Sequence, residues 1–215
     1  MKTTLIFVRH GQSTANLACV FTGHSDFPLT DLGMRQAENT ARFLEQYPIE
    51  KIYSSDLMRS MQTAEPTARH FGLSVIPDRE MREIFAGEWE GKRFDALLEE
   101  YGDRYAAWIH DCGRAHPNGG ESVAELGERI YRETDRILNE NCGKCVAIFS
   151  HATPIRLLNA RWQNIPVEEL AKVSFAPNAS VTVVEYDEDG TFTLKLSGYD
   201  KHQGELSTSL AKGMV

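Results

Sequence analysis

Short apolar runs alternate with amphipathic stretches along this chain, and their order predicts its fold. Residues 4–8 form a β-rich apolar run that is too short for a helix. Runs of this kind predict strands at 3–8, 50–54, 73–77, 145–150, 180–186 and 191–197. Helical spacing of apolar residues predicts helices at 31–46, 56–70, 93–110 (with a break near Gly102), 121–140 and 154–162.

The alternation of strands and helices predicts a three-layer α/β/α fold with a mixed, mostly parallel sheet. The last two strands flank Asp187-Glu-Asp-Gly190, which is typical of an antiparallel hairpin. We therefore expect one α/β domain over residues 1–198, followed by a polar, aperiodic and flexible C-terminal tail at 199–215.

The stretch from about 87 to 120 has no strand candidate and is too long for a simple crossover. Five aromatic residues lie in it: Trp89, Phe94, Tyr101, Tyr105 and Trp108. We expect a small helical cap over the carboxyl edge of the sheet. Ordinary packing of these helices against the core is the alternative, and the C-terminal tail is a second segment that could close over a site.

Composition and charge exclude several classes of function. The 215 residues carry a formal net charge of −8, which leaves no basic stripe for nucleic acid. Apolar runs fall short of the ~20 residues of a membrane span, and the N-terminal run is too short for a signal peptide. These features predict a cytoplasmic protein without nucleic-acid or membrane partners, whose oligomeric state leaves no signal in the sequence.

Two of the four cysteines, Cys142 and Cys145, have the spacing of a redox motif. They follow a predicted helix and lead into a strand, the reverse of the thioredoxin order. A turn cysteine and a buried strand cysteine are the favoured interpretation.

Candidate chemistry lies where the predicted strands end. Arg9-His10-Gly11 follows the first strand, at the edge where open α/β sheets bind ligands. The arginine fork suits phosphate oxygens, and the histidine can attack or transfer a proton near neutral pH. Arg59 follows the second strand, near the start of a helix with Ser55 as its expected cap. A cation at a helix N-terminus costs about 0.3–1 kcal/mol, which a bound anion would offset.

His151 follows the fourth strand, with Pro154 expected at the first helical position and Thr153 as the cap. Since the ends of parallel strands meet at one edge, these arginines and histidines converge on one site, and a phosphoryl group is their common target. A carboxylic acid is then needed to protonate the departing alkoxide. The segment 82–91 offers three candidates among which chemistry alone does not choose: Glu83, Glu88 and Glu90.

Taken in order, these motifs resemble the histidine phosphatase superfamily, in the branch that also contains cofactor-dependent phosphoglycerate mutase. The resemblance runs from about residue 3 to 185 and rests on Arg9-His10-Gly11, Ser54-Ser55-Asp56-Leu-x-Arg59-x-x-Gln-Thr-Ala, Glu83 ahead of Phe85-x-Gly87-x-Trp89-x-Gly91, Gly119-Gly120-Glu121-Ser122 and Ser150-His151.

The resemblance implies the following roles. His10 is the nucleophile that forms a phosphohistidine, and Glu83 is the proton donor that later activates water. Arg9, Arg59 and His151 hold the phosphoryl oxygens. The phosphate pocket also includes Asn16 and the amide of Ala152, which stands where many members have glycine, and Thr22 and Gly23 lie in a loop that often touches substrate. No metal or organic cofactor is implied.

Within the superfamily, mutases tend to carry a Glu-Arg-His-Tyr-Gly-like run at the acid and an insertion rich in Lys and Arg. Here Glu83 is followed by Ile-Phe-Ala and the 87–120 region is aromatic. The pattern is similar to α-ribazole phosphatase-like and broad-specificity small phosphatases. It predicts a metal-independent hydrolase of a small phosphorylated metabolite, with a mutase or a catalytically idle binding module as alternatives. The leaving group stays open. Of the other histidines, His24 could approach substrate, and the rest are expected to be structural or on the surface.

Overall fold

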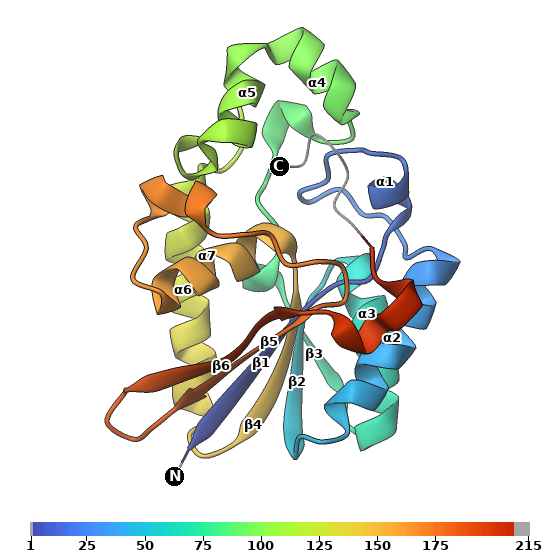
Figure 1. The fold of residues 1–215 in the computed structure, drawn as a ribbon, viewed down its shortest axis with the longest axis vertical. Helices are drawn as coiled ribbons and strands as arrows, with labels where there is room; N and C mark the ends of the chain where they lie inside the picture. The colour runs from blue at the N-terminus through green and yellow to red at the C-terminus, as the bar shows by residue number, and fades with distance from the viewer. Residues whose placement is uncertain (1, 209–215) are drawn as a thin grey trace.

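Six strands form one mixed sheet in the order β3-β2-β4-β1-β5-β6 (Figure 1). The computed structural model describes residues 2–208. The strands are β1 (Thr3–Arg9), β2 (Ile49–Ser55), β3 (Val75–Asp78), β4 (Cys145–Ser150), β5 (Val181–Tyr186) and β6 (Phe192–Tyr199). The first four are mutually parallel, whereas β5 runs antiparallel to both β1 and β6. The predicted sheet and its C-terminal hairpin are confirmed.

Helices cover both faces of the sheet. They are α1 (Thr14–Leu17), α2 (Asp31–Leu44), α3 (Met58–Phe71), α4 (Phe94–Tyr101), α5 (Asp103–His110), α6 (Val123–Glu140) and α7 (Ala152–Trp162). Successive residues of β1 pack on opposite faces, as strand geometry requires. Leu5 and Phe7 lie in the cluster of apolar residues that includes α6 and α7, and Ile6 and Val8 lie in the cluster that includes α2 and α3. The three-layer arrangement is therefore confirmed.

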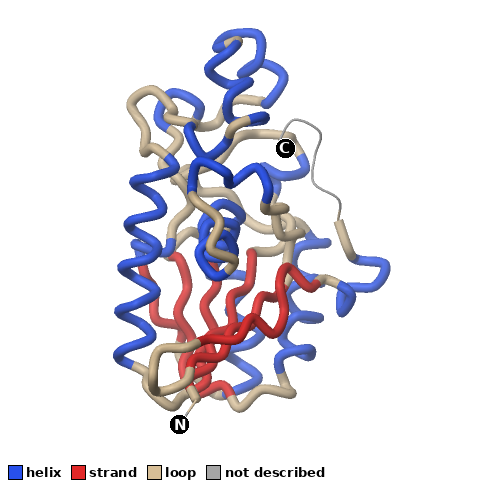
Figure 2. Tube along the Cα trace, turned by 60° about the vertical axis from the view of Figure 1, so that its left-hand side comes forward, coloured by secondary structure: helices blue, strands red, loops and turns tan. Residues whose placement is uncertain are grey.

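A helical insertion lies beyond the carboxyl ends of the parallel strands (Figure 2). Its main helices, α4 and α5, meet at Gly102, whose positive φ of 50° ends the first helix where the sequence predicts a break. The insertion is joined to the strand layer through Phe21, whose ring contacts Trp89, Phe94, Tyr105 and Trp108 with centroid distances of 5.1–6.4 Å. These aromatic residues belong to the same apolar cluster as Leu5 and Phe7 of β1, so the cap packs on the core of the domain.

Two predicted helix starts are wrong. The helix after β2 begins at Met58 with Leu57 at the N-cap position, so Ser55 does not cap it. The helix after β4 begins at Ala152 with His151 at the N-cap position, so Thr153 is not the cap and Pro154 is the third helical residue. The Ser55 hydroxyl lies 2.8 Å from His151 Nε2 and accepts from the amide of Leu57 at 3.4 Å.

The segment after β6 also differs from the predicted tail. Lys201–Leu206 forms the short 3₁₀ helix η5, which packs on α2. Gln203 is buried there, and its amide donates hydrogen bonds to the Gln36 carbonyl and the Thr40 hydroxyl. These polar contacts on α2 order a segment that lacks apolar periodicity. The rest of the predicted tail, residues 209–215, lies outside the described residues.

Each helix within residues 2–208 is too short or too polar to span a membrane.

Cys145 is buried as the first residue of β4, while Cys142 is an exposed turn residue, and both are free thiols. The interpretation of this pair as a turn cysteine and a buried strand cysteine is confirmed.

Candidate active site

The ends of three parallel strands meet at one edge of the sheet and bring the candidate residues together. Strand register pairs Arg9 of β1 with Ser150 of β4, and Ser54 of β2 with Phe149 of β4. The residue after each strand therefore lies at the same edge. The backbone N–H of His10 donates to the Ser150 carbonyl at 3.0 Å, which continues the sheet by one residue beyond β1.

His10 is buried in the protonation state that a nucleophile needs. Its Nδ1 lies 2.7 Å from the Gly11 carbonyl oxygen. A carbonyl only accepts, so Nδ1 carries the proton and Nε2 has a free lone pair. Burial, with the charges of Arg59 and Arg9, lowers the pKa of His10 well below its ordinary value of 6.5. The imidazole is therefore neutral at physiological pH, and Nε2 can attack an electrophile.

His151 packs against His10 and is also neutral. The ring centroids lie 5.2 Å apart, and burial followed by the charge of Arg59 lowers the pKa of His151 well below its ordinary value. The Nε2 atom of His151 lies 2.8 Å from the Ser55 hydroxyl oxygen. When that hydroxyl donates, the ring proton is on Nδ1 and the imidazole can act as a neutral hydrogen-bond donor.

The two arginines are almost completely buried. Arg9 donates from Nη1 to the Ala176 carbonyl at 2.6 Å, and Arg59 donates to the carbonyls of Gly23 and Ser25 at 2.8 and 3.0 Å. Burial lowers the pKa of each guanidinium to about 10, so both remain cationic at neutral pH. Two buried positive charges at one strand edge create a strong local attraction for an anion in a protein of net charge −8.

Three donor-capable atoms of these side chains lack a partner. Arg9 Nε, Arg59 Nε and His151 Nδ1 are buried and make no hydrogen bond to any described residue. Buried polar groups are usually satisfied, and each exception asks for an explanation. All three belong to residues for which the sequence predicts a phosphoryl contact.

A cavity opens beside His10 and extends beneath the cap. Its polar lining includes Arg9, His10, Asn16, Thr22 and Glu83, and its apolar lining includes Val20, Phe21, Ile84, Phe94, Trp108 and Phe175; Ala152 and Thr153 complete it. The empty space, including the open mouth, is about 470 Å³. Asn16 Oδ1 is already held by Ser13 and by Asn178, which leaves its amide nitrogen as the group that can donate. Ala152 supplies one of the first amides of α7, which have no acceptor inside the helix.

Three of the predicted contact residues do not line this cavity. Arg59 and His151 are buried and are not among its lining residues. Gly23 contributes its carbonyl to Arg59 and not a surface to the cavity. Its backbone passes so close to residues 84–86 that an added Cβ would lie 1.9 Å from the Ile84 carbonyl oxygen. Thr22 lines the cavity, and contact of Gly23 with substrate stays a prediction.

Geometry separates the three acid candidates. Only Glu83 lines the cavity, where its carboxylate accepts from the amides of Ile84 and Thr153 at 2.9 and 3.2 Å. Glu88 is exposed and accepts from the Asn118 side chain. Glu90 accepts from the amides of Gly23, His24, Ser25 and Ala86 and from the Ser25 hydroxyl. Burial alone would raise the pKa of Glu90, but these hydrogen bonds bring it below its ordinary value, so Glu90 is an ionised structural group.

Several residues at the site had no signal in the sequence pattern. Asn178 donates to the His10 carbonyl at 3.1 Å, from a loop far along the chain. Thr63, one turn after Arg59, accepts from the Gly11 amide at 3.0 Å.

His24, which the sequence suggested could approach substrate, lies outside the cavity, and its Nε2 contacts the Glu83 carbonyl at 3.1 Å. Within residues 2–208, no three His, Cys, Asp or Glu side chains are grouped so as to hold a metal ion.

Several known proteins are similar to this chain in sequence or in fold. Adenosylcobalamin/alpha-ribazole phosphatase of Escherichia coli is 30% identical over 168 residues, covering 77% of this chain and 82% of that protein. "Probable phosphoglycerate mutase GpmB" of Yersinia pestis is 32% identical over 181 residues, covering 84% of each. The solved structure of Bacillus stearothermophilus YhfR superposes with a TM-score of 0.89 at 28% identity, over 93% of this chain and 98% of that one.

The model of the histidine phosphatase superfamily (branch 1) matches residues 5–198, a span that includes every strand-end residue described above. The family is one of metal-independent phosphatases. On this match and on the shared fold, the chain is a member of the histidine phosphatase superfamily, branch 1.

Proposed function

We propose that this protein hydrolyses a phosphomonoester of a small metabolite through a phosphohistidine formed on His10. The observation that carries the proposal is the set of buried, unpartnered nitrogens on Arg9, Arg59 and His151, around a neutral histidine with a free Nε2. A phosphoryl group bonded to that Nε2 supplies oxygen acceptors for these donors. Each charge-assisted hydrogen bond of this kind stabilises by roughly 1.5–3 kcal/mol.

The first step transfers the phosphoryl group. The lone pair of His10 Nε2 attacks phosphorus while the bond between phosphorus and the ester oxygen breaks. Glu83, entering in its protonated form, gives its proton to the departing oxygen. Arg9, Arg59, His151 and the Ala152 amide hold the phosphoryl oxygens as charge redistributes. These donors need little reorganisation because strands and a helix start fix them.

The second step hydrolyses the intermediate. The Glu83 carboxylate takes a proton from a water molecule, whose oxygen attacks phosphorus as the P–N bond breaks. The products are inorganic phosphate and His10 with its lone pair restored, so one ester and one water yield one alcohol and one phosphate. Uncatalysed monoester hydrolysis is very slow, and enzymes accelerate it by up to about 10²¹-fold. The covalent intermediate contributes to this acceleration because it replaces one difficult step by two easier ones.

The wall of the cavity favours hydrolysis over phosphoglycerate mutation. Beyond the phosphoryl site the lining is apolar, and Arg9 and Glu83 are its only charged members among the described residues. A mutase must grip the carboxylate and the second phosphate of its substrate, and this lining offers no additional cation for them. An apolar wall suits the uncharged part of a leaving group.

Steady-state turnover with EDTA present, over a panel of phosphomonoesters, tests the proposal. The panel includes 3-phosphoglycerate with and without 2,3-bisphosphoglycerate. We expect release of inorganic phosphate from one or more esters and its loss in His10→Ala. Interconversion of phosphoglycerates without net phosphate release would instead identify a mutase. No turnover in the wild type, with ligand binding retained in His10→Ala, would identify an idle binding module.

A further inference from the structure

The segment that carries Glu83 has little regular structure of its own. It lies between two 3₁₀ turns, Arg79–Met81 (η1) and Gly87–Trp89 (η2), and belongs to no strand or α-helix. The position of the Glu83 carboxyl therefore depends on whatever holds this backbone in place. Proton transfer to a leaving group requires that carboxyl within hydrogen-bond reach, so the backbone of this segment sets the geometry of the acid.

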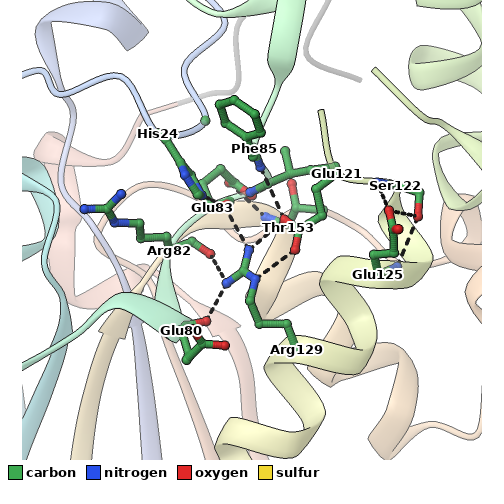
Figure 3. A network of polar contacts seen from close by, with 12 residues as sticks. His24, Glu80, Arg82, Glu83, Phe85, Glu121, Ser122, Glu125, Arg129 and Thr153 are labelled. Atoms are coloured by element: carbon green, nitrogen blue, oxygen red, sulfur yellow. Dashed lines mark hydrogen bonds and ion pairs between the residues drawn. The ribbon is translucent and has the colours of Figure 1, made fainter. Parts of the chain in front are cut away.

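Arg129, on α6, holds this backbone (Figure 3). Its Nη1 donates to the carbonyls of Glu80 and Arg82, the latter at 3.1 Å, and its Nη2 donates to the Glu83 carbonyl at 3.2 Å. Three backbone acceptors in four residues thus converge on one side chain. Arg129 itself does not line the catalytic cavity.

The remaining guanidinium donors bind Glu121. Nε and Nη2 of Arg129 contact the two carboxylate oxygens of Glu121 at 2.8 and 2.7 Å. The Glu121 carboxylate in turn accepts from the Phe85 amide at 3.3 Å. The pair therefore brackets the backbone on both sides of Glu83, with Arg129 on the carbonyls before it and Glu121 on an amide after it.

The chemistry of the pair suits a rigid support better than a simple ion pair. All five guanidinium N–H groups have an acceptor. A lysine cannot reproduce this arrangement, because its ammonium group has three donors and is not planar. The side chains of Arg129 and Glu121 are only 14% and 16% exposed, so solvent screens their hydrogen bonds weakly. By contrast, the side chain of Arg132 on the same helix is 69% exposed and forms an ion pair with the Glu80 side chain at 3.3 Å.

We propose that Arg129, braced by Glu121, is a positioning residue that holds the Glu83 carboxyl at the leaving-group oxygen. The proposal rests on the proposed function, in which Glu83 is the proton donor. Arg129 acts through the backbone at residues 80–83 and touches neither substrate nor the reacting atoms. Its loss should therefore weaken proton donation without removing the phosphoryl site.

The test compares kcat/KM for two classes of ester, because kcat/KM reports on steps up to release of the leaving group. An alkyl phosphate needs its leaving oxygen protonated, whereas 4-nitrophenolate leaves readily without a proton. Arg129→Lys should lower kcat/KM for alkyl phosphates by about 10–100-fold, the cost of an acid displaced by roughly 1 Å. It should lower kcat/KM for 4-nitrophenyl phosphate much less. Glu83→Gln should show the same selectivity more strongly.

Two further variants separate this role from general destabilisation. Arg132→Lys is the matched control on α6 and should leave both esters unaffected. Glu121→Gln removes the brace while keeping an acceptor, and should reproduce the selective loss even if Arg129→Lys folds poorly; thermal melts of each variant report folding. Equal loss for both esters in folded Arg129→Lys and Glu121→Gln, alongside a selective loss in Glu83→Gln, would overturn the positioning role. No selectivity in Glu83→Gln would instead overturn Glu83 as the acid of the proposed function.

Discussion

The imidazole rings of His10 and His151 meet edge to face, with their centroids 5.2 Å apart and their planes inclined by 60°. Strand register produces this contact, because β1 and β4 are adjacent, parallel and in step as far as Arg9 and Ser150. The next residue of each strand must then lie beside its neighbour. Burial, together with the charges of the nearby arginines, lowers the pKa of both rings and keeps them neutral, so that His10 has a free lone pair on Nε2.

Replacement of Arg59 by lysine should weaken the binding of phosphate analogues. Lysine retains the charge but cannot keep the two carbonyl contacts at Gly23 and Ser25 while facing an anion. Loss of one charge-assisted hydrogen bond should raise the inhibition constant for orthovanadate or phosphate by about 10–100-fold. Arg69→Lys, on the same helix with a 61% exposed side chain, is the control and should bind as the wild type does. Unchanged inhibition in Arg59→Lys would remove Arg59 from the phosphoryl site.

Replacement of Glu83 by glutamine and replacement of Glu90 by glutamine should impair the protein in different ways. Glu83→Gln should lower kcat by about 10²–10⁴-fold, the usual contribution of a general acid. Glu90→Gln cannot accept all the amide hydrogen bonds of residues 23–25, so it should lower the melting temperature and raise KM while retaining proton donation. Measurement of kcat, KM and melting temperature for both variants checks this division. A larger kcat effect in Glu90→Gln than in Glu83→Gln would reverse the assignment of the acid.

Most of the sheet and four of the central site residues follow from the sequence. Apolar runs place the strands, and strand ends then place Arg9, His10 and His151, because parallel strands share a carboxyl edge. Arg59 is found from its unfavourable place in the first turn of a helix. These signals are local in sequence.

The supports of the site could not be predicted in the same way. Ser55 has the sequence context of a helix cap but binds His151, since a strand-end side chain can satisfy either partner. Asn178 and Arg129 reach the site through contacts far apart in sequence, from a loop and from the side of a helix. The ordered η5 helix depends on polar contacts with α2, which apolar periodicity does not report.

Gly23→Ala should be one of the more damaging substitutions outside the phosphoryl contacts. A Cβ at this position would lie 1.9 Å from the Ile84 carbonyl oxygen and 2.5 Å from Glu90 Oε1, so the backbone must move. That movement would disturb the acceptors of Arg59 and the segment beside Glu83 together. We expect a lower melting temperature and a fall in kcat/KM, measured with 4-nitrophenyl phosphate. Gly72→Ala, at a helix end with open space around it, should destabilise only through its positive φ and spare kcat/KM. Wild-type kinetics in Gly23→Ala would contradict the close packing of this loop.

Stability should fall as the pH drops below about 6.5, the ordinary pKa of histidine. Burial and the nearby arginines depress the folded-state pKa of His151, so the unfolded chain binds the proton more tightly. The contribution is therefore complete above pH 6.5 and is lost progressively below it. His151→Gln should show a smaller loss of melting temperature between about pH 7.5 and about pH 5.5 than the wild type, and exposed His110→Gln should match the wild type. Burial raises the pKa of Asp78 to about 6, an opposing effect, and lowers the pKa of His10, an effect of the same sign as that of His151. Both groups are present in all three proteins, so the difference between the proteins reports on His151. An equal or larger loss in His151→Gln would contradict a neutral buried His151.

Rapid quench into base followed by peptide mass spectrometry tests most directly whether His10 carries the phosphoryl group. Mixing the enzyme with an ester that it hydrolyses should trap an acid-labile, base-stable phosphate on the peptide containing His10, formed at a rate no slower than steady-state turnover. The label should be absent in His10→Ala and should accumulate in Glu83→Gln when the ester is 4-nitrophenyl phosphate, because water activation is slowed. Turnover without any labelled histidine, or a label that persists in His10→Ala, would contradict the account.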